Sequence, residues 1–305
     1  MNSPKLNTLL KKSFSLLSVI RGYNILVLIS AQYLAAIFIF SEKKNLKPVI
    51  FDWHLLFLVI ATVCVVASGY IINNFYDIKA DKINRPVKFT LDSYVKQETK
   101  LTLYFFLNFI GFYFGWLVSW RASFFFAFYI FSIWFYSHKL KKHPLIGLIT
   151  STTLTLLPFF VIFIHYKNFS KVIFIHAFFL LFIILIRELI KDLENISGAI
   201  VNGYNTFPVA YGEKKTKQLI SLFLTLTLIP ITILFNYPAI QYMKYYFYFS
   251  GSILFFIGIF LWKSVTKKEY TILHTILKIL LLIGVFSLLF IDKTLLIDKV
   301  IPNIK

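Results

Sequence analysis

Long apolar runs, separated by short loops that carry Lys and Arg, constrain the fold of this chain more than any other feature of its sequence. A run of about 18 or more apolar residues can cross the hydrocarbon core of a bilayer as a helix. Only 15% of the residues are charged, against roughly 25% in soluble domains. The sequence predicts an all-α integral membrane protein with about nine transmembrane helices around a central cavity, at roughly 22–40, 54–76, 101–119, 122–138, 145–165, 172–191, 218–236, 245–262 and 272–291.

The first of these runs follows Arg21 and could be a signal peptide, but its length favours a retained helix. We therefore expect residues 1–305 to form a single polytopic membrane domain. The two longest loops, at about 77–100 and 192–217, lie four helices apart. That spacing suggests a repeated four-helix unit, at about 18–140 and 145–265, followed by a ninth helix. Lys278 falls inside the ninth run, where it is expected to face a cavity or to snorkel.

The net charge of +19 comes from basic residues in the loops. With the N-terminus in the cytoplasm, most Lys and Arg residues fall on the cytoplasmic side, as the positive-inside rule requires. We therefore expect a multi-pass protein of the cell (inner) membrane, with both long loops in the cytoplasm. No basic stripe accompanies a nucleic-acid-binding motif, so nucleic acid is not an expected partner.

The 13 acidic residues include a group at the end of the second apolar run. Asn73, Asp77 and Asp81 are spaced i, i+4 and i+8, which places them on one face of a helix. Two carboxylates on one face repel each other, and a divalent cation between them makes the arrangement favourable. Because Mg²⁺ is usually held by one or two carboxylates together with substrate phosphates, this spacing predicts a Mg²⁺ site.

A second acidic group ends the sixth run, where Glu188 and Asp192 repeat the i, i+4 spacing. A carboxylate wall opposite the first would let two Mg²⁺ ions grip one diphosphate. The cationic side chains of Arg85, Arg187 and Lys191 could then neutralise the remaining phosphate oxygens.

Two other interpretations compete with this shared site. Acidic residues at the ends of membrane helices can simply lie among lipid headgroups beside Lys, although two groups with one spacing on one side argue against it. A cation-coupled transporter would also use such acids. Transporter sites usually lie near the bilayer midplane on broken helices, whereas these acids lie at one surface and the second and sixth runs contain no Pro.

From about Arg21 to Gly212 the chain resembles the UbiA superfamily of intramembrane prenyltransferases. The family's first motif, Asn-Asp-x-x-Asp-x-x-x-Asp, matches here as Asn73-Asn74-x-x-Asp77-x-x-x-Asp81. Its Tyr-Ser-x-x-Leu-Lys pattern matches Tyr136-Ser137-His138-Lys139-Leu140-Lys141. Its second acidic motif matches Arg187-Glu188-x-x-Lys191-Asp192-x-Glu194-Asn195, and Arg21 and Asn24 match an Arg-x-x-Asn pattern near the first helix.

This resemblance implies a UbiA-like fold and the Mg²⁺-dependent transfer of a prenyl group from an isoprenoid diphosphate to a hydrophobic acceptor inside the membrane. Mg²⁺ would be held by Asn73, Asp77, Asp81, Glu188 and Asp192. The residues expected to take part in catalysis are Asp77, Asp81, Asp192 and Tyr136. Those expected to bind the substrates are Asn24, Arg85, Lys141, Arg187 and Lys191. Tyr136 could instead belong to an interfacial aromatic belt, and Lys141 could serve only as an orientation charge.

The acceptor could be aromatic or lipid-like, and the Arg-Glu-x-x-Lys-Asp form of the second motif is most similar to the lipid-type and chlorophyll-type branches. Three positions depart from the family pattern. Asn74 stands where the family commonly has Asp, and it lies about 100° off the stripe of the first group. Asn195 and Ala199 replace Asp in the second motif and raise the alternative of a non-catalytic relative that only binds an isoprenoid.

Overall fold

The protein is helical throughout the residues that the computed structural model describes, which are 4–41 and 47–291. Eight helical segments in these ranges are long and apolar enough to cross a membrane. They are Gly22–Phe40 (α2, Gly22–Ala35, with η1, Ala36–Phe40), Trp53–Tyr76 (α4), Gln97–Val118 (α7), Pro144–Tyr166 (α9), Lys171–Glu194 (α10), Phe207–Phe235 (α12), Ile240–Lys263 (the end of η3, Pro238–Met243, with α13, Lys244–Lys263) and Lys267–Phe290 (α14, Lys267–Ser287, with η4, Leu288–Phe290).

The helix α8 (Trp120–His138) is the remaining segment that the sequence predicts to cross the membrane. It has 19 residues and packs against α4, α7 and α9. Its Trp, Tyr and Ser residues and Arg121 make it less apolar than the eight others. The all-helical membrane fold is therefore confirmed, while the count of nine spans stays a prediction.

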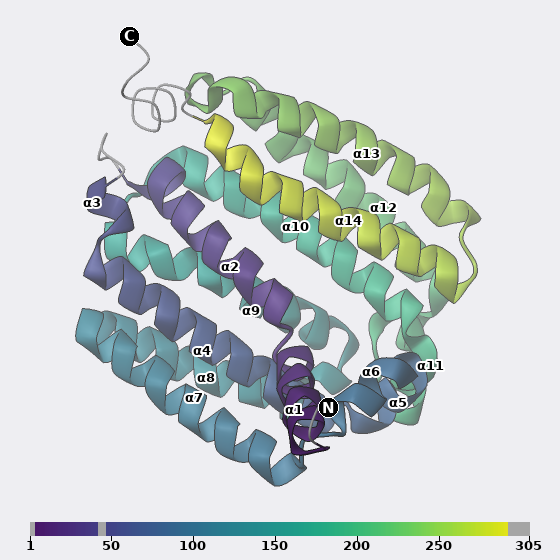
Figure 1. Ribbon diagram of the computed structural model, residues 1–305. Coiled ribbons are helices and arrows are strands. Elements are labelled where there is room, and N and C mark those ends of the chain that lie inside the picture. The colour runs from purple at the N-terminus through teal and green to yellow at the C-terminus, as the bar shows by residue number, and fades with distance from the viewer. Residues whose placement is uncertain (1–3, 42–46, 292–305) are drawn as a thin grey trace.

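The long helices run side by side as a bundle (Figure 1). On one side α4 packs against α7 and α8, and on the other α10 packs against α12 and α14. The helix α9 contacts α4, α8, α10 and α12, and so joins the two groups. The suggested four-helix repeat and the single-domain boundaries stay predictions.

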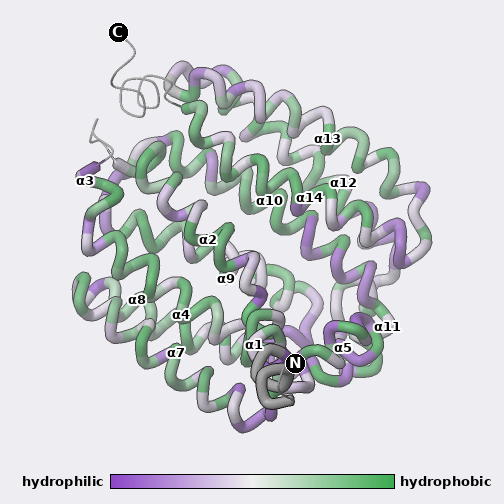
Figure 2. The backbone as a smooth tube through the Cα atoms, in the orientation of Figure 1, coloured by the Kyte–Doolittle hydropathy of each residue, from purple (hydrophilic) through white to green (hydrophobic). Residues whose placement is uncertain are grey.

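The outer surface of this bundle carries large apolar side chains. Phe105, Phe109 and Trp116 of α7 are exposed, as are Phe124 and Phe128 of α8. A soluble protein rarely exposes a continuous apolar surface of this kind, because contact with water would make it unstable or adhesive. These faces suit lipid, and Figure 2 shows apolar residues along most of the long helices.

The two predicted long loops are largely helical, which corrects the sequence-based expectation. The first contains α5 (Ile78–Asn84) and α6 (Pro86–Asp92), and the second contains α11 (Ile196–Val201). These short helices gather with α1 (Pro4–Val19) at one end of the bundle, whereas α3 (Lys47–Ile50) lies at the other end (Figure 1). The chain thus builds a small helical layer at the end where both acidic groups are located.

Candidate active site

The first acidic group lies at a break between two helices. α4 ends at Tyr76 and α5 begins at Ile78, so Asp77 is the junction residue, with φ −93° and ψ 8°. The helix face predicted from the i, i+4, i+8 spacing is therefore interrupted at Asp77. The backbone N–H of Asp77 still donates to Asn73 and that of Asp81 to Asp77, at 2.9 and 2.8 Å. This ladder keeps all three side chains close together even though the helix is interrupted.

Asp77 is held from two distant parts of the chain. Its Oδ2 pairs with Nζ of Lys141, which follows α8, at 2.5 Å. Its Oδ1 accepts a hydrogen bond from the hydroxyl of Tyr204, which follows α11, at 2.8 Å. The lysine ammonium also lies 5.1 Å from the Tyr204 ring centroid, a cation–π distance. Asn73 accepts a hydrogen bond from Ser137 through Oδ1 at 2.9 Å, which fixes its amide oxygen.

The Asp81 carboxylate has no hydrogen bond or ion pair within the part of the chain that the structure describes. Its side chain is half-buried. Burial, followed by repulsion from Asp77, raises the pKa of the Asp81 carboxyl above its usual range, with Lys88, Arg85 and Arg21 opposing that rise. A desolvated carboxylate beside a second one is an oxygen ligand that a hard cation would stabilise.

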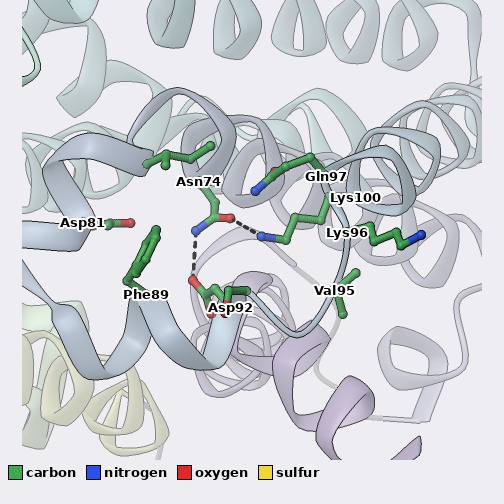
Figure 3. A pocket seen from close by; sticks show the side chains of 10 residues that line it. Asn74, Asp81, Phe89, Asp92, Val95, Lys96, Gln97 and Lys100 are labelled. Atoms are coloured by element: carbon green, nitrogen blue, oxygen red, sulfur yellow. Dashed lines mark hydrogen bonds between the residues drawn. The ribbon is translucent and has the colours of Figure 1, made fainter. Parts of the chain in front are cut away.

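Asn74 makes its hydrogen bonds with residues outside this group. Its amide donates to Oδ2 of Asp92 and accepts from Nζ of Lys100, both at 2.9 Å. These three residues line a cavity of about 210 Å³ that Asp81 also lines (Figure 3). Asn74 is therefore a structural residue here, in agreement with its predicted position off the stripe.

The second acidic group stays on one continuous helix, α10. Oε2 of buried Glu188 pairs with Lys191 at 2.7 Å, and Oε1 lies 3.6 Å from Nη2 of Arg187. Asp192 is half-buried and makes no hydrogen bond or ion pair among the described side chains. Glu194 does not join the group, because it pairs with Nδ1 of His274 on α14 at 3.0 Å. Arg187 donates through Nε to the other nitrogen of that imidazole at 3.3 Å.

Cations connect the two acidic groups. Lys141, the partner of Asp77, also interacts electrostatically with Asp192. Arg85, which joins α5 to α6, interacts with Asp81 and with Glu194. The two groups therefore lie at the same end of the molecule and share positive side chains, so both can act on one ligand.

Tyr136 and the helix packing also bring the two groups together. The Tyr136 ring on α8 is half-buried, and its hydroxyl lies within electrostatic range of Glu188, Asp192 and Asp77. Close packing of α5 on α11 joins the acidic ends of α4 and α10. A Cβ added at Gly198 would lie 2.9 Å from the carbonyl oxygen of Ala80, so only glycine permits this approach.

Among the described residues, no three His, Cys, Asp or Glu side chains are arranged to hold a metal by themselves. The donor set nevertheless fits Mg²⁺, which binds few protein carboxylates and takes its other oxygen ligands from substrate phosphates and water. Asp81 and Asp192 are available for that role. Asp77 and Glu188 are neutralised by lysines.

Asn24, another predicted substrate residue, is held by α4. Its amide donates to the hydroxyl of Tyr70 on α4 at 3.3 Å. Sequence reasoning missed Tyr204, Ser137 and His274, which hold the acidic and basic residues in place. Ser137 lies inside a recognised motif. No local spacing distinguishes Tyr204 or His274, because their partners are 127 and 80 residues away.

Apolar helices that carry paired carboxylates and cations at one end place this chain in the class of multi-pass membrane prenyltransferases. The model of the UbiA prenyltransferase family matches residues 28–290. Because this match covers most of the chain, the protein belongs to the UbiA prenyltransferase family.

Its curated relatives include digeranylgeranylglyceryl phosphate synthases. The protein of that name from Methanobrevibacter smithii is 29% identical over 206 residues, which cover 64% of this chain and 69% of the relative. The one from Sulfurisphaera tokodaii is 28% identical over 225 residues, covering 73% and 75%.

Solved structures share the fold at lower identity. A structure of digeranylgeranylglyceryl phosphate synthase in membranes has a TM-score of 0.66 and 22% identity, covering 90% of this chain and 96% of that one. A UbiA homologue from Archaeoglobus fulgidus, bound to DMAPP and Mg²⁺, has a TM-score of 0.67 and 12% identity, covering 90% and 98%.

Proposed function

We propose that this protein transfers a prenyl group from an isoprenoid diphosphate to a lipid acceptor that carries glycerol phosphate. The observation that carries the proposal is Lys141, which pairs with Asp77 and interacts with Asp192, so that two acidic groups face a shared cation. The names of the synthases from M. smithii and S. tokodaii support the lipid acceptor. The DMAPP and Mg²⁺ bound to the A. fulgidus homologue support the donor and the ion.

Mg²⁺, when bound with the diphosphate, would neutralise charge that develops on the leaving group. The residues that would hold the ion are Asn73, Asp77, Asp81, Glu188 and Asp192. Cationic side chains of the protein would neutralise further negative charge on the diphosphate. Lys141 and Lys191 can exchange their carboxylate partners for diphosphate oxygens, which frees Asp77 and Glu188. Arg187 and Arg85 lie beside the second and first groups and can bind the remaining oxygens.

The bond between the allylic carbon and the diphosphate oxygen then breaks, and the acceptor hydroxyl forms a new bond to that carbon and loses its proton. The Tyr136 ring can steady positive charge on the allylic carbon through its face. Apolar helix faces keep water from competing with the acceptor. Asn24, held by Tyr70, would contact the acceptor.

The orientation follows from charge. We propose that the layer formed by α1, α5, α6 and α11 lies in the cytoplasm, and that the surrounding bilayer is the cell (inner) membrane. The loops on the same side of the membrane as this layer carry most of the Lys and Arg residues, in accord with the positive-inside rule. The diphosphate would thus reach the acidic groups from the cytoplasmic side.

The alternative of an isoprenoid binder without turnover rests on Asn195 and Ala199. The Asn195 amide donates to the carbonyl of Lys191 at 2.6 Å, so it caps the end of α10 instead of offering a carboxylate. A cation-coupled transporter is less well supported, because both acidic groups lie at one end of the bundle and not at its middle.

Pyrophosphate release by the purified protein in detergent tests the proposal. The assay contains Mg²⁺, geranylgeranyl diphosphate, and either geranylgeranylglyceryl phosphate or one of a panel of aromatic acceptors. We expect release only with the lipid acceptor, and loss of release with a chelator. Asp77→Asn should lower the rate by about 10²- to 10³-fold. Asp52→Asn, which preserves a helix N-cap at the start of α4, serves as the matched control.

Donor binding without release, with every acceptor and donor length, would favour the non-catalytic binder. Release with an aromatic acceptor alone would keep the transferase and overturn the lipid acceptor. Chelator-resistant release would contradict the role of Mg²⁺.

A further inference from the structure

Two cations outside the acidic groups lie near the start of α2, each over a tyrosine ring. Nζ of Lys278 on α14 lies 4.0 Å from the ring centroid of Tyr23 on α2. The guanidinium of Arg21, which precedes α2, lies 4.9 Å from the ring centroid of Tyr70. Lys278 and Arg21 interact electrostatically with each other, and α2 packs against α14. Within the described residues, neither cation forms an ion pair with a carboxylate.

The position of Lys278 is costly for the fold. It stands at the middle of the 24-residue span Lys267–Phe290, and its side chain is exposed on the outside of the bundle. Ionisable residues inside membrane helices are expensive and therefore usually bind something. Arg21 adds a second cost, since its φ of 52° lies in the left-handed region that favours glycine. Backbone strain of this kind concentrates at functional sites.

Two like charges held near each other are relieved by an anion between them. The acidic site is adjacent, because Arg21 interacts electrostatically with Asp81. The diphosphate of the donor already has Lys141, Lys191 and Arg187 at that site. With the diphosphate served by these three cations under the proposed function, Arg21 and Lys278 are left for an anionic group of the second substrate.

We infer that Arg21 and Lys278 bind the phosphate of a phosphorylated lipid acceptor, an inference that rests on the proposed function. A phosphate monoester carries close to two negative charges, which two cations match. Arg offers paired N–H donors and Lys a compact charge, a combination suited to phosphate. Tyr23 is 52% exposed, so the site opens to the surface where a membrane lipid travels. Asn24 lies three residues after Arg21, and the acceptor's glycerol would extend from the phosphate toward it.

Steady-state kinetics of Lys278→Gln test the site, with the phosphorylated lipid and its neutral alcohol as alternative acceptors. We expect the KM for the phosphorylated acceptor to rise at least about tenfold. The KM for the donor and the KM for the neutral acceptor should stay within about twofold. Lys278→Arg should restore most of the loss, and Lys268→Gln, at an exposed lysine on the same helix, should leave all three constants unchanged.

A rise in donor KM would assign the cations to the diphosphate and overturn the inference. If the KM values for both acceptors change equally, or neither changes, the inference is overturned. Lys278 would then be a snorkelling side chain that covers Tyr23.

Acceptor binding separates this inference from the proposed function, because it needs no turnover. The phosphorylated acceptor should raise the thermal unfolding temperature of the wild type more than that of Lys278→Gln. Phosphatidylglycerol, a phosphodiester headgroup lipid, should not displace it. Displacement by phosphatidylglycerol would identify a general headgroup site and overturn the acceptor assignment. A wild type that binds the acceptor but transfers no prenyl group would refute the proposed function alone.

Discussion

Each of the two acidic groups brings carboxylates close together and neutralises one of them with a lysine, but the lysines come from different parts of the chain. In each, one carboxylate is paired with a lysine and a second is not: Asp77 pairs with Lys141, and Glu188 with Lys191. Lys141 is 64 residues from its partner, whereas Lys191 is three residues from its partner on the same helix. The first group is thus assembled by tertiary structure and the second largely by one helix.

This difference has consequences for robustness. Asp77 lies at a helix junction and depends on segments after α8 and after α11, so disturbance of either segment reaches it. Glu188 is buried on continuous α10 and keeps Arg187 nearby if Lys191 is lost. The first group should therefore be the more sensitive of the two, and the comparison can be tested residue by residue.

The largest effect is expected at the two carboxylates that lack partners. Asp81→Asn and Asp192→Asn should each lower the rate of pyrophosphate release by about 10²- to 10³-fold, because each removes a negative ligand from the site proposed to bind diphosphate with Mg²⁺. Release at saturating donor and acceptor is the measurement. Full activity of Asp192→Asn would remove the second group from the site.

The lysines come next in size. Lys141→Met removes a charge-assisted contact worth about 1.5–3 kcal/mol, so the donor KM should rise by about 10- to 100-fold. Lys191→Met should raise it by only about 3- to 10-fold, because a local pair of this kind contributes less. Rates measured at increasing donor concentration give the donor KM of each variant and show which lysine matters more. The reverse order would show that the two groups do not differ in the proposed way.

The contact between the groups can be loosened at Gly198. A Cβ there would lie 2.9 Å from a backbone oxygen of α5, so Gly198→Ala should destabilise the protein by about 1–3 kcal/mol through overpacking. Thermal unfolding in detergent should show a lower midpoint. Gly251→Ala on α13 is the matched control, because a Cβ added there has no neighbour within 4 Å. An unchanged midpoint for Gly198→Ala would mean that α5 and α11 separate easily.

The smallest effect is expected at Tyr204. Tyr204→Phe removes the hydrogen bond to Asp77 but keeps the ring beside Lys141, which should cost about 1 kcal/mol, or about fivefold in rate. Tyr211→Phe, an exposed tyrosine on α12, provides the comparison. Equal rates for both variants would show that Lys141 alone orients Asp77.

Much of this fold and part of the site follow from sequence alone, for identifiable reasons. Hydropathy predicts the spans because each must match the bilayer thickness, and α8 is uncertain because its aromatic and polar residues blur that signal. The i, i+4 spacing predicts the acidic groups. It does not reveal the break at Asp77, because no Pro or Gly marks it. Tyr204 and His274 reach the site only through packing, so their roles require the structure.

Lysines that neutralise Asp77 and Glu188 in the absence of substrate impose an order on binding. A free divalent ion that binds Asp77 or Glu188 must displace a lysine from that carboxylate, and the lysine then has no new partner. An ion that arrives with diphosphate supplies that partner. Under the proposed function, metal and donor would therefore raise each other's affinity by the same factor, as thermodynamic linkage requires. The protein would then take up its metal most readily together with the molecule to be cleaved.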